Sequence, residues 1–224
     1  MLSYEVALSF FGIAVLLALS PGPDNLFVLM QSAMWGRASG MLVVLGLCTG
    51  LIFHTIAVAV GLAAVFATSA LAFMVLKLAG ALYLLYLAWG AFRAPVDTTI
   101  GEEATQAKAQ DAATSSTTRT RLSAGSLYRG GIIMNLTNPK VSLFFLAFLP
   151  QFTSPARGSV ALQTLSLGAL FILATLLVFG VIAWFSGAIG ERMQRSHTAQ
   201  RILNRVAGTV FVGLALKLAF MGRQ

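Results

Sequence analysis

Ser20-Pro21-Gly22-Pro23-Asp24-Asn25 interrupts a long apolar run near the start of the chain, and Asp24 is the only charged residue between positions 6 and 34. The two prolines and the glycine break a helix, because proline lacks a backbone donor and its ring clashes with the preceding turn. Within a bilayer, irregular backbone is tolerated only where protein buries it or where it lines a cavity. The stretch therefore predicts a broken membrane helix with a functional site at the break.

The composition around this stretch is that of a membrane protein. The 224 residues are 58% hydrophobic and 10% charged, whereas soluble domains carry about 25% charged residues. Apolar segments long enough to cross the bilayer predict an all-α integral membrane protein with six transmembrane helices. We place them at 5–34, 40–66, 69–92, 127–150, 159–187 and 204–221. The first is too long for one straight crossing, and the break near Pro23 explains the excess.

Residues 94–121 divide the six segments into two groups of three. This stretch is polar and charged, without apolar periodicity, and we interpret it as a flexible linker. The predicted organisation is a first three-helix repeat at 1–93, the linker, and a second three-helix repeat at 122–224. Because each repeat has an odd number of spans, the two would insert as inverted repeats.

The basic residues predict the orientation of the chain. With the N-terminus outside, the inside loops hold Arg37, Arg93, Lys108, Arg119, Arg121, Arg129, Arg192, Arg195, Arg201 and Arg205. The outside would hold only Lys77, Arg157, Lys217 and Arg223. By the positive-inside rule, both termini lie outside and the linker is cytoplasmic. The net charge of +8 is thus assigned to membrane orientation, and no nucleic-acid partner is expected.

A second proline break, Asn135-Leu136-Thr137-Asn138-Pro139-Lys140, lies at the corresponding place in the second half. Interrupted segments at matching positions of two halves point to the binding site of a transporter. In both breaks a cap residue precedes a proline, as at the start of a helix. Such restarted helices expose backbone N–H groups that bind a carboxylate. Single prolines often only kink membrane helices, but two breaks, each beside a midplane charge, favour a site.

Three ionisable side chains are candidates within the predicted spans. Asp24 has three possible roles: it stabilises the positive end of its helix as an acid in the first turn, it binds a substrate ammonium, or it exchanges a proton. Lys140 either pairs with Asp24 or contacts a substrate carboxylate, and the sequence leaves both open. His54 is either a packed histidine or a proton relay. It lies on one helical face with four small residues that allow close helix packing, namely Gly46, Gly50, Ala57 and Gly61.

Patterns for other chemistries do not stand out. The sequence offers no paired-carboxylate site, no His/Cys cluster for a metal and no phosphate-binding loop. We therefore expect no enzyme activity, no metal and no cofactor. The alternatives are a cation or metal exporter, for which only Asp24, His54 and Cys48 could supply ligands, an intramembrane enzyme, or a membrane scaffold.

The motifs together resemble the LysE/RhtB family of bacterial amino-acid exporters. The resemblance rests on the two break motifs, the glycine and histidine spacing above, the run from Lys77 to Leu84, Phe144-Phe145, and the stretch from Leu149 to Phe152. It covers the chain apart from the linker. The resemblance implies a bacterial inner-membrane exporter with six helices, driven by proton antiport and forming a homodimer.

We therefore expect a secondary transporter that exports a neutral or small hydrophobic amino acid, of the homoserine, threonine or leucine type. The expected partners are the amino acid, protons and the lipid bilayer. The residues expected to bind substrate are Pro21, Gly22, Pro23, Asp24, Asn25, Asn135, Asn138, Pro139 and Lys140. Asp24 and His54 are the candidates for proton coupling.

Overall fold

The structure is a computed structural model that describes residues 2–20, 22–68, 70–93, 122–186 and 197–220. Every regular element in these ranges is helical. The α-helices are α1 (Tyr4–Leu19), α2 (Pro23–Trp35), α3 (Arg37–Thr68), α4 (Ala70–Arg93), α6 (Ala124–Thr137), α7 (Pro139–Leu143), α8 (Val160–Phe185) and α10 (His197–Phe220). A π-helical turn (Phe144–Phe148) and two 3-10 turns (Leu149–Phe152, Pro155–Arg157) join α7 to α8.

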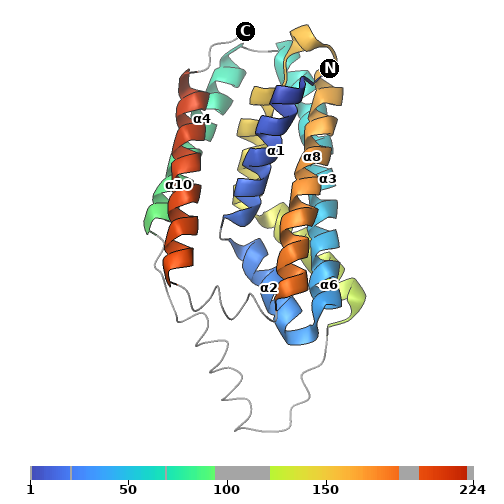
Figure 1. Cartoon of the computed structure of the whole chain (residues 1–224). Helices are drawn as coiled ribbons and strands as arrows, with labels where there is room; N and C mark the ends of the chain where they lie inside the picture. The colour runs from blue at the N-terminus through green and yellow to red at the C-terminus, as the bar shows by residue number, and fades with distance from the viewer. Residues whose placement is uncertain (1, 21, 69, 94–121, 187–196, 221–224) are drawn as a thin grey trace.

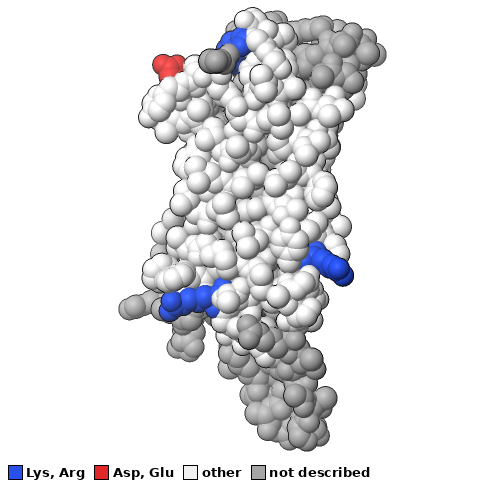
Figure 2. Space-filling model, turned by 90° about the vertical axis from the view of Figure 1, so that its right-hand side faces the viewer, with Lys and Arg blue, Asp and Glu red and all other residues white. Residues whose placement is uncertain are grey.

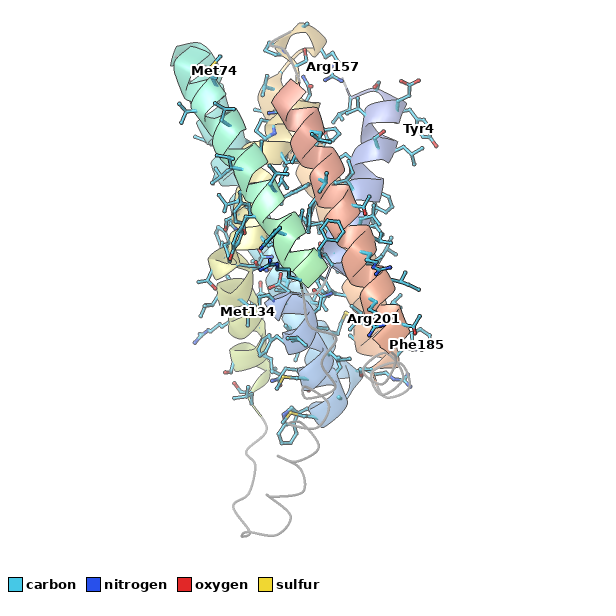
Figure 3. The ribbon with its side chains drawn as sticks, turned by 90° about the vertical axis from the view of Figure 1, so that its left-hand side faces the viewer. Tyr4, Met74, Met134, Arg157, Phe185 and Arg201 are labelled. Atoms are coloured by element: carbon cyan, nitrogen blue, oxygen red, sulfur yellow. The ribbon has the colours of Figure 1, made fainter. Side chains whose placement is uncertain are left out.

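The helices form an elongated bundle with their axes roughly along one direction (Figure 1). Helix α3 packs against α2, α6 and α8, while α1 packs against α8 and α4 packs against α10. The start of α1 and the end of α10 lie at the same end of the bundle (Figure 1). Figure 3 places Tyr4 and Arg157 at this end, and Phe185 and Arg201 at the other.

The outer face of the bundle is suited to lipid. Between its two ends, the face seen in Figure 2 shows almost only uncharged described residues, and Lys, Arg, Asp and Glu lie toward the ends. Large apolar side chains on α3 and α8 point outward, including Phe53, Val60, Leu177 and Trp184, each about half exposed or more. Exposed apolar surface of this extent is a membrane-facing surface rather than a solvated one.

Two of the described helices are continuous and are long and apolar enough to cross a membrane. They are α3 within Arg37–Gly61 and α8 over Val160–Phe185. Two further crossings are broken: α1 and α2 meet at 63°, and α6 meets the segment Pro139–Phe152 at 51°. A multi-pass helical membrane protein is therefore confirmed. Both predicted breaks are confirmed in place, whereas the six-span count and the inverted repeat stay predictions.

The start of α10 differs from the predicted boundary. Helix α10 begins at His197, seven residues before the predicted start at 204. Hydropathy marks only the part of a helix inside the hydrocarbon layer, whereas the backbone continues as a helix where side chains such as Arg201 are exposed. The predicted linker at 94–121 lies outside the described residues.

Two apolar clusters pack on either side of the breaks. One is rich in aromatic rings, with Phe10 of α1 edge-on to Phe152 at 5.1 Å between ring centroids and Phe144 5.4 Å from Phe171 of α8. The other joins α2, α3, α6 and α8 through residues such as Val28, Leu47, Leu127 and Phe179. The polar residues of both breaks lie between these clusters along the chain.

Candidate functional site

The first break is a helix end followed directly by a helix start. Ser20 closes α1, with its backbone N–H donating to Leu16 O at 3.0 Å. Gly22 caps α2, and Pro23 takes the first helical position, as predicted. The Asn25 side chain reaches back, and its Nδ2 donates to Ala18 O at 2.9 Å. Asn25, predicted to bind substrate, thus also satisfies one of the carbonyls left free where α1 ends.

The second break repeats this arrangement with a side-chain cap. Helix α6 ends at Thr137, and Asn138 Oδ1 accepts a hydrogen bond from the backbone N–H of Lys140 at 3.0 Å. Pro139 occupies the first position of α7. Asn138 O accepts from Ser142 N at 3.1 Å, which completes the first turn. The asparagine therefore starts the helix in the way expected of a cap residue.

Lys140 connects the two breaks. Its Nζ donates to Ser20 O at 3.0 Å and to Leu17 O at 3.3 Å, both at the end of α1. A Cβ at Gly22 would lie 3.0 Å from this Nζ. The backbone of Gly22 is extended, so a glycine is needed here for close approach rather than for an unusual φ. The sequence left two partners open for Lys140, and the structure adds a third, the carbonyls of the broken helix.

Asp24 lies in the first turn of α2, only 3% exposed. The Lys140 ammonium attracts its carboxylate, and the Asn138 side chain lies beside it. The breaks thus bring Asp24 beside Asn138 and Lys140, which lie far from it in sequence but close to each other. A buried carboxylate with a cation opposite it is far less costly in a membrane than a lone charge.

Several buried polar atoms at this place have no hydrogen-bond partner. Over the described residues six such side-chain atoms occur, and four belong to the two breaks: Asp24 Oδ1, Asn25 Oδ1, Asn135 Oδ1 and Asn138 Nδ2. Asn135 and Asn138 are each only 2% exposed. Because buried polar groups are nearly always paired, these atoms are available to bind a water, an ion or a polar ligand. Three of these atoms accept and one donates.

The helical face with His54 packs against α6 over part of its length. A Cβ at Gly46 would overlap the carbonyl of Tyr128, and a Cβ at Gly50 would lie 2.6 Å from Asn135 Oδ1. His54 Nε2 lies 3.4 Å from Asn135 O. The fold thus brings His54 to the second break, where it can act as a packed histidine or a relay.

Within the described residues of this chain, the other end of this face is not closely packed. Ala57 and Gly61 are exposed, and a Cβ at Gly61 would have nothing within 4 Å. The reason is that α6 ends at Thr137, where the chain bends by 51° away from its previous direction. Beyond that point α3 has no α6 beside it.

Of the other predicted residues, Pro23 and Pro139 are exposed and act by starting their helices, while Pro21 lies outside the described residues. The prediction missed Gln31, which is 8% exposed and has an unpaired Oε1. Gln31 follows Asp24 by seven positions, about two helical turns, so the period of the helix would have placed it on the same face. It also missed Thr175 on α8, which is buried with an unpaired hydroxyl.

Metal-ligand chemistry finds little support in this arrangement. Within the described parts of the chain, no three His, Cys, Asp or Glu side chains come together. Cys48 is buried on α3. The donors and acceptors at the breaks are instead amides, one carboxylate, one ammonium and backbone groups, a set that matches a small zwitterion.

Comparison with known proteins agrees with this chemistry. A family model described as LysE type translocator matches residues 15–222. A homoserine/homoserine lactone efflux protein of Salmonella typhimurium is 34% identical over 206 residues, 92% of each chain. A leucine efflux protein of Salmonella choleraesuis is 30% identical over 212 residues, 92% of this chain and 91% of its own length. An uncharacterized membrane protein of Bacillus subtilis is 28% identical over 215 residues, 94% and 96% of the two chains.

No solved structure matches the chain significantly. The family model nevertheless spans both breaks, α3, α8 and all of α10. With two helix ends and two helix starts meeting around Asp24, Asn138 and Lys140, this multi-pass membrane protein belongs to the LysE-type translocator family.

Proposed function

We propose that this protein is a secondary transporter that exports a neutral or small hydrophobic amino acid from the bacterial cytoplasm. The observation that supports this most directly is the group of unpaired polar atoms where the two breaks meet. Their burial, between two apolar clusters, is suited to a small polar ligand held out of contact with lipid.

The site offers complementary groups for both ends of an amino acid. Asp24 Oδ1, an unpaired buried acceptor, receives the substrate ammonium. Asn138 Nδ2, an unpaired buried donor, binds the substrate carboxylate, helped by the N–H groups at the start of α2 and the positive end of its dipole. One anionic and one cationic side chain, Asp24 and Lys140, leave the site neutral overall, which matches a zwitterion without an extra charge.

The substrate class follows from this charge balance and from the relatives. Two relatives are named as efflux proteins for homoserine or its lactone and for leucine. Both homoserine and leucine are amino acids with uncharged side chains. We accordingly propose a substrate of the homoserine, threonine or leucine type.

The proposed mechanism is alternating access of two inverted three-helix repeats, 1–93 and 122–224, around the two breaks. Under this scheme α3 corresponds to α8 and α4 to α10, and each of these pairs is in contact. We place this bundle in the bacterial inner membrane, with six spans, both termini outside and the linker in the cytoplasm. An even number of spans agrees with a bundle in which α1 begins and α10 ends on the same side. A homodimer stays a prediction.

Proton antiport is the proposed source of energy. Asp24 is the ionisable group closest to the substrate in this scheme, and His54 adjoins the second break through Asn135 O. Binding of a substrate ammonium and of a proton to the same carboxylate would be mutually exclusive. That exclusion couples the two in opposite directions.

The test is efflux from loaded bacteria, across a panel of about twenty amino acids, by wild type, Asp24→Asn and Glu5→Gln. Glu5 is an exposed acid in the first turn of α1, so Glu5→Gln controls for loss of a carboxylate elsewhere. We expect selective efflux of an uncharged amino acid that is lost only in Asp24→Asn. In proteoliposomes, an imposed pH gradient should accelerate the same flux. If no amino acid leaves faster than from vector controls, despite equal membrane expression, the exporter proposal fails.

A further inference from the structure

Lys140 fills a cation site that a different part of the chain has built. The oxygens around its Nζ are Leu17 O at 3.3 Å and Ser20 O at 3.0 Å. Asp24 adds a negative charge from the start of α2. The end of α1 adds the negative end of a helix dipole. We call this set, Leu17 O, Ser20 O, Asp24 and the backbone of Gly22, the cation cradle.

The cation cradle is formed by a part of the chain that is distant in sequence from the residue that fills it. All of its groups come from residues 17–24, whereas Lys140 enters from α7, 120 positions beyond Ser20. Gly22 presents no side chain there, and a Cβ would lie 3.0 Å from Nζ and 3.6 Å from Cε. The cradle therefore accommodates an alkylammonium, and we expect its groups to stay in place if the lysine is shortened.

The filled cradle has a consequence for substrate charge. Asp24 and Lys140 together carry no net charge. Because Lys140 is only 8% exposed, water does not screen its charge. A substrate with a second ammonium would bring an uncompensated positive charge next to Lys140, which is unfavourable in a low-dielectric site. Without the lysine, the same site would carry one net negative charge and would match a substrate with one net positive charge.

We propose that Lys140 is a specificity-determining residue that excludes dibasic amino acids by filling the cation cradle with its own ammonium. This inference rests on the proposed function as an amino-acid exporter. Shortening Lys140 vacates the carbonyls of Leu17 and Ser20 for the side-chain ammonium of lysine or ornithine, while Asp24 and Asn138 still bind the amino-acid end.

The transport test compares lysine with norleucine, whose side chain has a methyl group where lysine has an aminomethyl group. Efflux of both is measured in wild type, Lys140→Ala and Lys140→Arg at matched expression. We expect the ratio of lysine to norleucine efflux to rise at least tenfold in Lys140→Ala, and to stay low in Lys140→Arg, which keeps a cation. An unchanged ratio in Lys140→Ala, with norleucine still exported, overturns the proposal.

A second test requires no transport and therefore separates this inference from the proposed function. Purified Lys140→Ala in detergent is heated with propylammonium or with tetramethylammonium, which has no N–H donor. We expect propylammonium to raise the midpoint of denaturation of the variant, tetramethylammonium to have no such effect, and wild type to respond to neither. Equal responses of variant and wild type would overturn the cradle, even if wild type exports amino acids.

Propylammonium also provides a test if Lys140→Ala does not fold. If Lys140→Ala is not recovered, Lys140→Ser is expressed and purified with propylammonium throughout. A vacant cradle should bind the free cation and restore the fold. Failure of both variants to fold in its presence would contradict a cradle that accepts a separate ammonium. If wild type exports nothing but propylammonium still protects the variant, the exporter proposal fails and the cation cradle stands.

Discussion

The crossing of α3 and α6 leads to a sharp prediction for Gly46. A Cβ at this position would overlap the carbonyl oxygen of Tyr128 and would lie 2.9 Å from Gly131 Cα and 3.0 Å from Ile132 N. All three are backbone atoms, so no side chain can rotate away to make room. Gly46→Ala therefore requires α6 itself to move outward.

The size of the effect follows from these distances. Ordinary contact begins at 3.4 Å, so the helices must separate by about an ångström or more to clear the Tyr128 carbonyl oxygen. Overpacking of this kind destabilises proteins by about 1–3 kcal/mol. For a chain of this size, that corresponds to a fall of roughly 2–12 °C in the midpoint of thermal denaturation. Because α6 also carries Asn135 and leads into Asn138, we expect amino-acid efflux to fall as well.

Gly61→Ala is the matched control on the same helix. Nothing lies within 4 Å of a Cβ there, and the residue is exposed. The alanine should be neutral or stabilising by up to about 1 kcal/mol, because alanine favours a helix over glycine. Intrinsic tryptophan fluorescence on heating measures both variants. If Gly46→Ala denatures at the same temperature as Gly61→Ala, the close crossing of α3 and α6 is refuted.

Two further predictions concern single hydrogen bonds. Asn138→Ser keeps a cap oxygen for α7 but loses the unpaired Nδ2, so we expect near wild-type thermal stability with weakened efflux, while Asn138→Ala should also lose about 1 kcal/mol. Equal efflux by Asn138→Ser and wild type would show that the Asn138 amide nitrogen does not bind substrate. The hydroxyls of Thr49 and Tyr128 lie 2.8 Å apart, and a double-mutant cycle with Thr49→Val and Tyr128→Phe should give a coupling of about 0.6 kcal/mol. Additive denaturation shifts would contradict this bond.

The breaks were predictable from sequence because their cause is local. Proline fixes φ and removes a donor wherever it stands, so Pro23 and Pro139 mark helix starts without any knowledge of the fold. The capping role of Asn138 follows from the same local geometry. The nearby cation of Asp24 was predictable in kind, because a lone charge in an apolar run needs a partner.

The partner of Lys140 was not predictable in the same way. Every residue has a carbonyl, so the sequence does not reveal which carbonyls remain free once helices end and pack. Leu17 O and Ser20 O became acceptors only because α1 ends beside α7 in space. The exposed end of the glycine face has a similar explanation, since the period of α3 gives the direction of a face but not the length of its neighbour.

The 120-residue separation between Ser20 and Lys140 also matters for how the protein is made. The first broken helix enters the membrane long before the ribosome reaches the lysine. At about 5–20 residues per second, the delay is roughly 6–24 s. Over this interval Asp24 and the carbonyls at the end of α1 lack their cation. An unpaired Asp24 carboxylate in the hydrocarbon core raises the free energy of insertion by about 2.5–3.5 kcal/mol. The first half of the nascent chain thus lacks the Lys140 ammonium until the second proline break has been synthesised.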